Sequence, residues 1–201
     1  MTLTTPDFVI NEIKTVYQGY FRIDRYRLRH RTFNGGWSGE VVREVFERGH
    51  AVAVLLFDPD RDEVVMIEQF RVGAVAAGRP PWLLEVVAGI IGSGESDDEV
   101  ARRETIEEAG CTVTDMIRIG DYLVSPGGTS ETNTLFCARV DASLAGGIHG
   151  LANEQEDIRV KVMSSGAAIA RLDADGIDNA ATIIALGWLA RHRDDIRRCW
   201  P

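Results

Sequence analysis

Three glutamates in the segment ARRETIEEAG, at 101–110, have a spacing that would let them act together. Glu104, Glu107 and Glu108 stand at i, i+3 and i+4, so in a helix they share one face. Gly110 is the expected end of that helix. The C-terminal end of a helix carries partial negative charge, so a carboxylate there costs about 0.3–1 kcal/mol. The pattern therefore indicates that a positive group should lie nearby.

Two interpretations of this acidic face stay open from the residues alone. The first is a solvated helix face whose charge is partly neutralised by Arg102 and Arg103. The second is a divalent-cation site, because hard cations such as Mg²⁺ prefer oxygen ligands and the three carboxylates can converge on one point. The spacing favours the second interpretation.

Several other kinds of active site are missing from the sequence. It contains no GxxxxGK[ST] phosphate loop, no HExxH zinc motif and no GxSxG nucleophile elbow. The four histidines lie far apart in the sequence and are expected to be structural or exposed. The three cysteines form no CxxC pair and are odd in number, which is typical of a reduced cytosolic protein.

The composition limits the classes of function further. A chain of 201 residues with 45% hydrophobic residues is long enough for one ordinary domain with a buried core. The net charge of −9, without a basic stripe, argues against a general nucleic-acid or anionic-membrane surface. No signal peptide is apparent, and the apolar run at 51–57 is far shorter than the roughly 20 residues needed to cross a bilayer. We therefore expect a soluble, cytoplasmic protein.

The elements that must position the glutamates follow from the apolar patterns. From 14 to 70 the chain has short or alternating apolar runs separated by turn signals, which predicts strands. The segment at 81–90 leads into a glycine-rich stretch ending at Ser96, a good N-cap, so a helix is expected from Asp97. Four of its apolar residues are expected to pack on the sheet: Val100, Ala101, Ile106 and Ala109.

Beyond this helix the pattern predicts further strands and two helices. The strands are expected near 114–123, 133–140 and 157–163, and Ser164 and Asp178 are the expected N-caps of the helices. This order of elements lacks a regular βαβ alternation and predicts an α+β sandwich.

The segment GIIGSGESDDEVARRETIEEAGC, at 89–111, resembles the signature of the Nudix hydrolase family, G-x5-E-x7-R-E-U-x-E-E-x-G-U, where U is apolar. The matching positions are Gly89, Glu95, Arg103, Glu104, Glu107, Glu108 and Gly110. Thr105 departs from the pattern, because the family prefers an aliphatic residue there. We expect Thr105 to loosen the packing slightly without changing the acidic face, and Cys111 to act as a small hydrophobic residue.

From about Lys14 onward the chain is similar to the bacterial ADP-ribose pyrophosphatases of this family, in segments such as EQFRVGA, PWLLEVVAG, SPGGTSE and IDNAATIIALGWL. Pro126 also matches a proline associated with ADP-ribose specificity. The resemblance implies a Nudix-type α/β/α sandwich with a mixed sheet and an antiparallel β-rich N-terminal part. It further implies a dimerisation and substrate-binding segment at 1–48, a hydrolase domain at 49–201, and a homodimer.

The activity implied by the resemblance is hydrolysis of the pyrophosphate bond of ADP-ribose to AMP and ribose 5-phosphate. The implied cofactor is Mg²⁺ or Mn²⁺, with two or more ions per site. Two alternatives stay open: a Nudix hydrolase for another nucleoside diphosphate sugar such as GDP-mannose, and a non-catalytic ADP-ribose sensor. The intact acidic face favours catalysis, because a pure binder has no need of carboxylates that destabilise a helix end.

The resemblance also implies roles for individual residues. The implied metal ligands are Glu104, Glu108, Glu156 and the backbone carbonyl of Ala88. The implied catalytic residues are Glu154 as the base, Glu107 as an outer ligand, and Arg103, which holds a carboxylate with Glu95 as its partner. The implied substrate-binding residues are Tyr20 for adenine, Arg43 and Arg71 for phosphates or the terminal ribose, and Ser125, Gly127, Gly128 and Glu131 in a tight turn.

These roles have ordinary structural alternatives when the residues are considered alone. Glu154 and Glu156 could belong to a solvated acidic loop. Arg43 and Arg71 could form surface ion pairs. Tyr20 could be a core residue of a strand.

Overall fold

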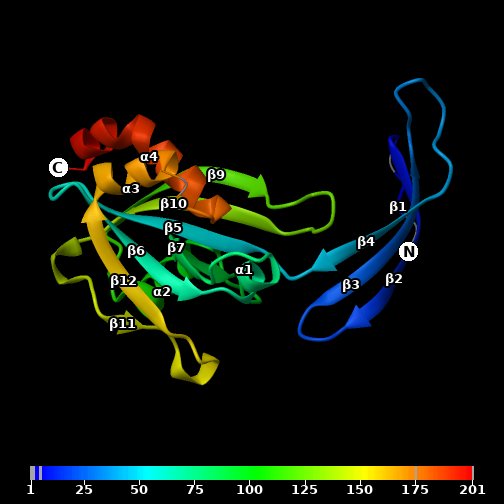
Figure 1. The fold of residues 1–201 in the computed structure, drawn as a ribbon. Helices are drawn as coiled ribbons and strands as arrows, with labels where there is room; N and C mark the ends of the chain where they lie inside the picture. The colour runs from blue at the N-terminus through cyan, green and yellow to red at the C-terminus, as the bar shows by residue number, and fades with distance from the viewer. Residues whose placement is uncertain (1–2, 5, 175, 201) are drawn as a thin grey trace. The chain divides into compact units, whose positions relative to one another are not determined.

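The fold is that of a computed structural model, which describes residues 3–4, 6–174 and 176–200, without the side chains of residues 3, 4 and 154. The chain divides into two compact units, and Figure 1 shows the elements of each. The first unit comprises Met1–His50 and Leu123–Thr132. The second comprises Ala51–Tyr122 and Asn133–Pro201.

The first unit is an antiparallel sheet with the strand order β1-β2-β3-β4. Its strands are β1 (Leu3–Thr4), β2 (Phe8–Gln18), β3 (Arg22–His30) and β4 (Val41–Glu47). The segment at 123–132 is joined to β4, because the Phe46 amide donates to the Gly128 carbonyl at 2.8 Å and the Thr129 hydroxyl donates to the Phe46 carbonyl at 2.8 Å. The expected antiparallel, β-rich N-terminal part is confirmed.

The second unit is built around a mixed sheet with the order β11-β12-β6-β5-β10-β9, in which β7 pairs with β6 and β8 pairs with β5. Strands β5 and β10 run parallel, and β5 is antiparallel to β6 and β8. The strands are β5 (Ala51–Asp58), β6 (Glu63–Phe70), β7 (Trp82–Glu85), β8 (Val87–Ile90), β9 (Asp115–Leu123), β10 (Thr132–Arg139), β11 (Ile148–His149) and β12 (Ile158–Ser164).

Helices cover both faces of this sheet and make the expected α/β/α sandwich (Figure 1). The helices are α1 (Val72–Ala76), α2 (Asp97–Ala109), α3 (Ser165–Asp173) and α4 (Ala180–Cys199), with 3₁₀ turns η1 (Ala142–Leu144) and η2 (Ala152–Glu154). Alternate residues of β5 point to opposite faces: Val54 packs in the cluster that contains Val100 of α2, and Leu55 packs in the cluster that contains Leu186 of α4. Every residue of β5 is therefore buried.

Helix α2 begins and ends where the sequence predicts. The Ser96 side chain accepts from the Glu99 amide, and the Glu99 carboxylate accepts from the Ser96 amide, which is a complete capping box. At the other end Gly110 adopts a left-handed conformation with φ of 64°. The caps fix the register of the helix and hence the direction of its glutamates.

Two details of the helices differ from the predictions. Ile106 was expected to pack on the sheet, but it is 57% exposed, and Thr105 is fully buried in its place. The Thr105 hydroxyl donates to the Ala101 carbonyl at 2.7 Å, so the polar group is satisfied inside the core. The N-cap of α4 is Asn179 and not Asp178, because the Asn179 side chain accepts from the Thr182 amide; Ser164 is confirmed as the N-cap of α3.

Within the described part of the chain, no helix is long and apolar enough to span a membrane.

Candidate active site

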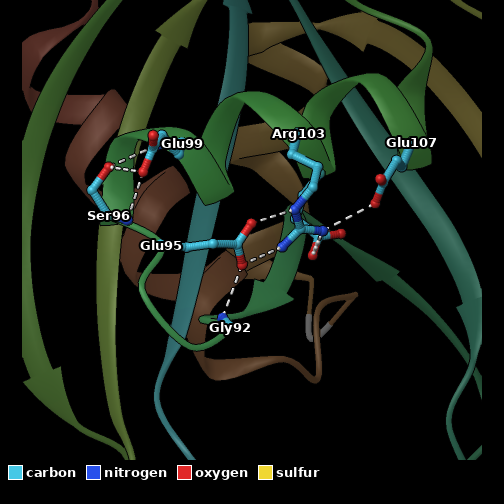
Figure 2. Close-up of polar contacts among 7 residues, drawn as sticks. Gly92, Glu95, Ser96, Glu99, Arg103 and Glu107 are labelled. Carbon is cyan, nitrogen blue, oxygen red and sulfur yellow. Dashed lines mark hydrogen bonds and ion pairs between the residues drawn. The ribbon is translucent and has the colours of Figure 1, made fainter.

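Arg103 connects the carboxylates at the centre of α2, as Figure 2 shows. Its guanidinium donates to both oxygens of Glu95, from Nε at 2.9 Å and from Nη2 at 3.1 Å. The remaining nitrogen, Nη1, donates to Glu104 at 2.7 Å and to Glu107 at 3.1 Å. One rigid cation thus fixes three carboxylates, which matches the contact with Glu95 expected for Arg103.

The loop before α2 holds the other side of this ion-pair network. Glu95 accepts a hydrogen bond from the Gly92 amide at 2.9 Å (Figure 2). The hydrogen bond from Arg103, followed by that from Gly92, lowers the pKa of Glu95. The same contact with Glu95 raises the pKa of Arg103. Glu95 is therefore an anionic anchor for Arg103.

Glu104 lies directly against β8. A methyl group on Gly89 would overlap the Glu104 carboxylate, so only glycine leaves this space free. Burial raises the pKa of Glu104, although the hydrogen bond from Arg103 opposes that change. The first residue of the signature is therefore a glycine here for a steric reason, because the Glu104 carboxylate occupies the space of a side chain at Gly89.

Glu108 is the most buried of the three helical glutamates, with 3% of its surface exposed. Its Oε2 accepts from the Ala88 amide at 3.0 Å, which ties α2 to β8. Burial raises the pKa of Glu108 to about 8, and the Ala88 hydrogen bond only partly opposes this effect. A carboxylate in such a place indicates that a positive charge belongs beside it.

The charges that act on Glu108 show which groups lie around it. Glu104 and Glu156 raise its pKa, and Arg71 lowers it. Glu156, whose Oε2 accepts from the Leu151 amide at 3.2 Å, also raises the pKa of Glu104. The fold therefore brings together carboxylates from α2 and from the loop before β12, although 48 residues of sequence separate Glu108 from Glu156.

These side chains are chemically suited to bind a divalent cation, but they are not arranged as a complete coordination shell. Among the described residues, no group of three or more His, Cys, Asp or Glu side chains is placed to hold an ion. Instead, one oxygen of Glu104 accepts from Arg103 and one oxygen of Glu108 accepts from the Ala88 amide. The donor set consists of carboxylate oxygens, which hard cations prefer, and burial is the main cause of the raised pKa values of Glu104 and Glu108.

The metal-free protein should lose stability as the pH rises from 5 to 8. The folded-state pKa of Glu108, about 8, lies above the ordinary glutamate value of 4.5, so the stability associated with protonation is complete below pH 4.5 and is lost as the pH rises through 8. We expect a loss on the order of 3 kcal/mol for this group. Thermal unfolding in EDTA at both pH values, for the parent and for Glu108→Gln, measures it. An equal loss in both proteins would contradict the assignment.

Arg71 forms a second ion pair, with a residue that sequence reasoning missed. Its Nε donates to Glu85 Oε2 at 2.7 Å, and the other oxygen of Glu85 accepts from Asn179 at 2.6 Å. Glu85 is 2% exposed. A charged residue inside the apolar run PWLLEVVAG was the available signal, because a buried carboxylate requires a partner.

The other residues expected in the site lie in two places. The backbone of Glu154 belongs to η2, two residues before Glu156, and its side chain lies outside the described residues. Tyr20 is 89% exposed in the turn between β2 and β3, so it is not a core residue. Arg43 lies on β4, where its Nη1 donates to the Val42 carbonyl at 2.8 Å.

The segment SPGGTSE forms the expected tight turn in the first unit. The Ser125 carbonyl accepts from the Gly128 and Thr129 amides, both at 3.0 Å. Gly127 and Gly128 have open space where a side chain would begin. Glu131 is 7% exposed and pairs with Arg48 at 3.5 Å. Since these residues belong to the first unit and the clustered glutamates to the second, a single shared site remains a prediction.

Comparison with known proteins gives consistent matches. The NUDIX domain model matches residues 47–183. The chain is 52% identical over 200 residues to the ADP-ribose pyrophosphatase of Escherichia coli strain K12, covering 100% of this chain and 96% of that protein. It is 32% identical over 193 residues to the GDP-mannose pyrophosphatase of Pectobacterium atrosepticum, covering 90% and 96%. A crystal structure of an ADP compounds hydrolase has the same fold, with a TM-score of 0.70 at 21% identity, covering 94% and 98%.

Proposed function

The chain belongs to the Nudix family, and from this premise we propose that it hydrolyses ADP-ribose with water to AMP and ribose 5-phosphate. The observation that carries the proposal is the 52% identity, over the whole chain, to an enzyme named ADP-ribose pyrophosphatase. The acidic face of α2 supports hydrolysis over simple binding, because the described glutamates there are buried or held in position by Arg103. A pure ADP-ribose sensor would not require this arrangement.

Nudix hydrolases generally depend on divalent metal ions. We propose that Glu104, Glu108, Glu156 and the Ala88 carbonyl would hold Mg²⁺ or Mn²⁺, in two or more positions. A bound cation of this kind neutralises phosphate charge and makes a water molecule more acidic. Arg103 occupies Oε1 of Glu104 and the Ala88 amide occupies Oε2 of Glu108, so each carboxylate keeps a second oxygen that could bind the ion.

The chain's own residues perform the remaining tasks in this proposal. Arg103 and Glu95 keep Glu104 and Glu107 oriented toward the reaction centre. Glu154 accepts a proton from the attacking water, so that the water oxygen bonds to phosphorus while the P–O–P bridge breaks. Glu107 acts as an outer acceptor. The two products leave as phosphate monoesters, AMP and ribose 5-phosphate.

We assign the substrate groups by the chemistry of the side chains. Arg71 and Arg43 bind phosphate or terminal-ribose oxygens, because guanidinium groups suit such acceptors. Tyr20, exposed in its turn, stacks on adenine. Four residues of the tight turn contact the remainder of the ligand: Ser125, Gly127, Gly128 and Glu131.

The organisation of the enzyme is part of the proposal. The segment at 1–48 mediates homodimerisation and contributes to substrate binding, and 49–201 is the hydrolase domain. Exposed apolar residues of β2 support an association surface, since Ile13 is 43% and Tyr17 is 60% exposed. The location is proposed to be cytoplasmic.

A second candidate is hydrolysis of GDP-mannose, which the 32% identity to a GDP-mannose pyrophosphatase favours. The deciding experiment is chromatography of the products after incubation with ADP-ribose or GDP-mannose, with and without Mg²⁺. We expect AMP from ADP-ribose only when Mg²⁺ is present, and a much lower kcat/KM for GDP-mannose. Preferential cleavage of GDP-mannose would replace the first proposal with the second. Saturable ADP-ribose binding without cleavage would indicate a sensor.

A further inference from the structure

A hydrogen-bonded chain leads from the start of α4 to the guanidinium of Arg71. Asn179 Nδ2 donates to Glu85 Oε1 at 2.6 Å, and Arg71 Nε donates to Glu85 Oε2 at 2.7 Å. Both oxygens of the Glu85 carboxylate are thereby occupied, one by an amide and one by a cation. The side chain of Glu85 is 3% exposed, whereas that of Arg71 is 38% exposed. The carboxylate is thus fixed inside the protein and the guanidinium reaches the surface.

The position of Asn179 is itself fixed by the helix that it caps. Its Oδ1 accepts from the Thr182 amide at 3.0 Å and from the Thr182 hydroxyl at 3.1 Å. The Thr182 hydroxyl in turn accepts from the Val86 amide at 3.0 Å, next to Glu85 in the sequence. Thr182 is fully buried. These hydrogen bonds therefore join the start of α4 to the residue that follows β7. Glu85, the last residue of β7, has little freedom to move as a result.

Arg71 and Glu156 lie at the same end of the antiparallel pair β6–β12, because Gln69, two residues before Arg71, pairs with Ile158, two residues after Glu156. Among the described residues, the hydrogen bond from Nε to Glu85 is the one that the Arg71 guanidinium makes. Since Nε is engaged from behind by Glu85, Nη1 and Nη2 remain to bind an anion as a fork.

We propose that Glu85 and Asn179 are positioning residues, which hold Arg71 so that its fork receives a phosphate of the diphosphate substrate. This inference rests on the proposed hydrolysis of a nucleoside diphosphate compound and deepens it. Long flexible arginine side chains lose conformational entropy when they bind a ligand, and a buried carboxylate anchor removes much of that loss beforehand. The N-cap residue of α4 then has a functional task besides starting the helix.

Two variants separate positioning from folding. Glu85→Gln keeps the shape and removes the charge that orients Arg71. Asn179→Ser keeps an N-cap for α4 and is too short to reach Glu85, so it removes only the bridge. We expect KM for ADP-ribose to rise about tenfold in Glu85→Gln, and by a smaller factor in Asn179→Ser, with kcat changing less than KM. Thermal unfolding verifies that each variant is folded.

A matched control comes from another ion-paired glutamate of the same unit. Glu68 accepts from Lys161 Nζ at 2.7 Å and its side chain is 20% exposed. Glu68→Gln should leave KM unchanged. If this variant raised KM as much as Glu85→Gln, the effect would reflect general loss of an ion pair, and the positioning role would be wrong.

A double-mutant cycle tests whether Glu85 acts through Arg71. In the Arg71→Ala background, Glu85→Gln should change KM less than about twofold, because the group that it orients is gone. Equal effects of Glu85→Gln with and without Arg71 would overturn the proposal.

Nuclear magnetic resonance gives a readout that does not depend on activity or on the variants of Glu85. The Arg71 Nε–H signal, identified by its absence in Arg71→Lys, should exchange slowly with solvent in the parent protein, because it is hydrogen-bonded to a buried carboxylate. Exchange as fast as that of an exposed arginine would contradict the anchor. If instead the anchor is present but the parent protein does not cleave ADP-ribose, the proposed function fails while the described anchor stands.

Discussion

Glu108→Gln is expected to lower kcat for ADP-ribose about 1,000-fold at saturating Mg²⁺, which corresponds to about 4 kcal/mol of transition-state stabilisation. Glutamine has nearly the same shape and can still accept from the Ala88 amide through its carbonyl oxygen, so the contact between α2 and β8 is kept. The substitution removes the negative charge of Glu108, which burial disfavours in the absence of a cation. The variant should therefore be folded and inactive.

The control for this experiment lies on the same helix. Asp98 pairs with Arg102 at 3.0 Å on the exposed side of α2, with side chains 59% and 44% exposed. Asp98→Asn should retain near-parent kcat, because an exposed i,i+4 pair contributes only a few tenths of a kcal/mol to stability. If Glu108→Gln also retained near-parent kcat in saturating Mg²⁺, the assignment of Glu108 as a metal ligand would be wrong.

Gly89→Ala is expected to lower kcat/KM about 100-fold with little change in thermal stability. The added methyl group would overlap the Glu104 carboxylate and displace it. A side chain can rotate at small energetic cost, but a catalytic group displaced by about 1 Å loses on the order of 100-fold in rate. Steady-state kinetics and the unfolding temperature, measured on the same preparation, distinguish displacement from unfolding.

Gly166→Ala is the matched substitution. Gly166 lies in α3, where an added methyl group meets nothing within 4 Å, so this variant should keep full activity and unchanged or slightly higher stability. Parent-like activity of Gly89→Ala would mean that the position of Glu104 against β8 is not required for the reaction.

The local features of α2 could be predicted because their causes lie within a few residues. The Ser96 cap, the left-handed Gly110 and the shared face of the glutamates all follow from short-range hydrogen bonding and helical periodicity. The strands observed at 115–123, 132–139 and 158–164 were predicted near 114–123, 133–140 and 157–163 for the same reason, since apolar alternation is a local signal. Asn179 was missed as the cap of α4 because Asp178 is an equally good capping residue.

Which residues of α2 are buried was harder to predict from the sequence. Ile106 and Thr105 are adjacent, and hydrophobicity favours burial of Ile106. The structure buries Thr105, because its hydroxyl donates to the Ala101 carbonyl within the helix and needs no other partner. A polar residue whose hydroxyl is hydrogen-bonded within its own helix can occupy a core position, and hydrophobic periodicity alone does not reveal such a residue.

The sequence by itself determined the family and the acidic face of α2, because a signature of fixed spacing places Arg103 and its neighbouring glutamates on one helix. Only the tertiary structure decided how deeply Glu108 is buried, which charges surround it, and that Glu85 and Asn179 hold Arg71. These properties depend on contacts between segments up to 94 residues apart. Burial and electrostatic environment arise from such distant contacts, and no local spacing encodes them.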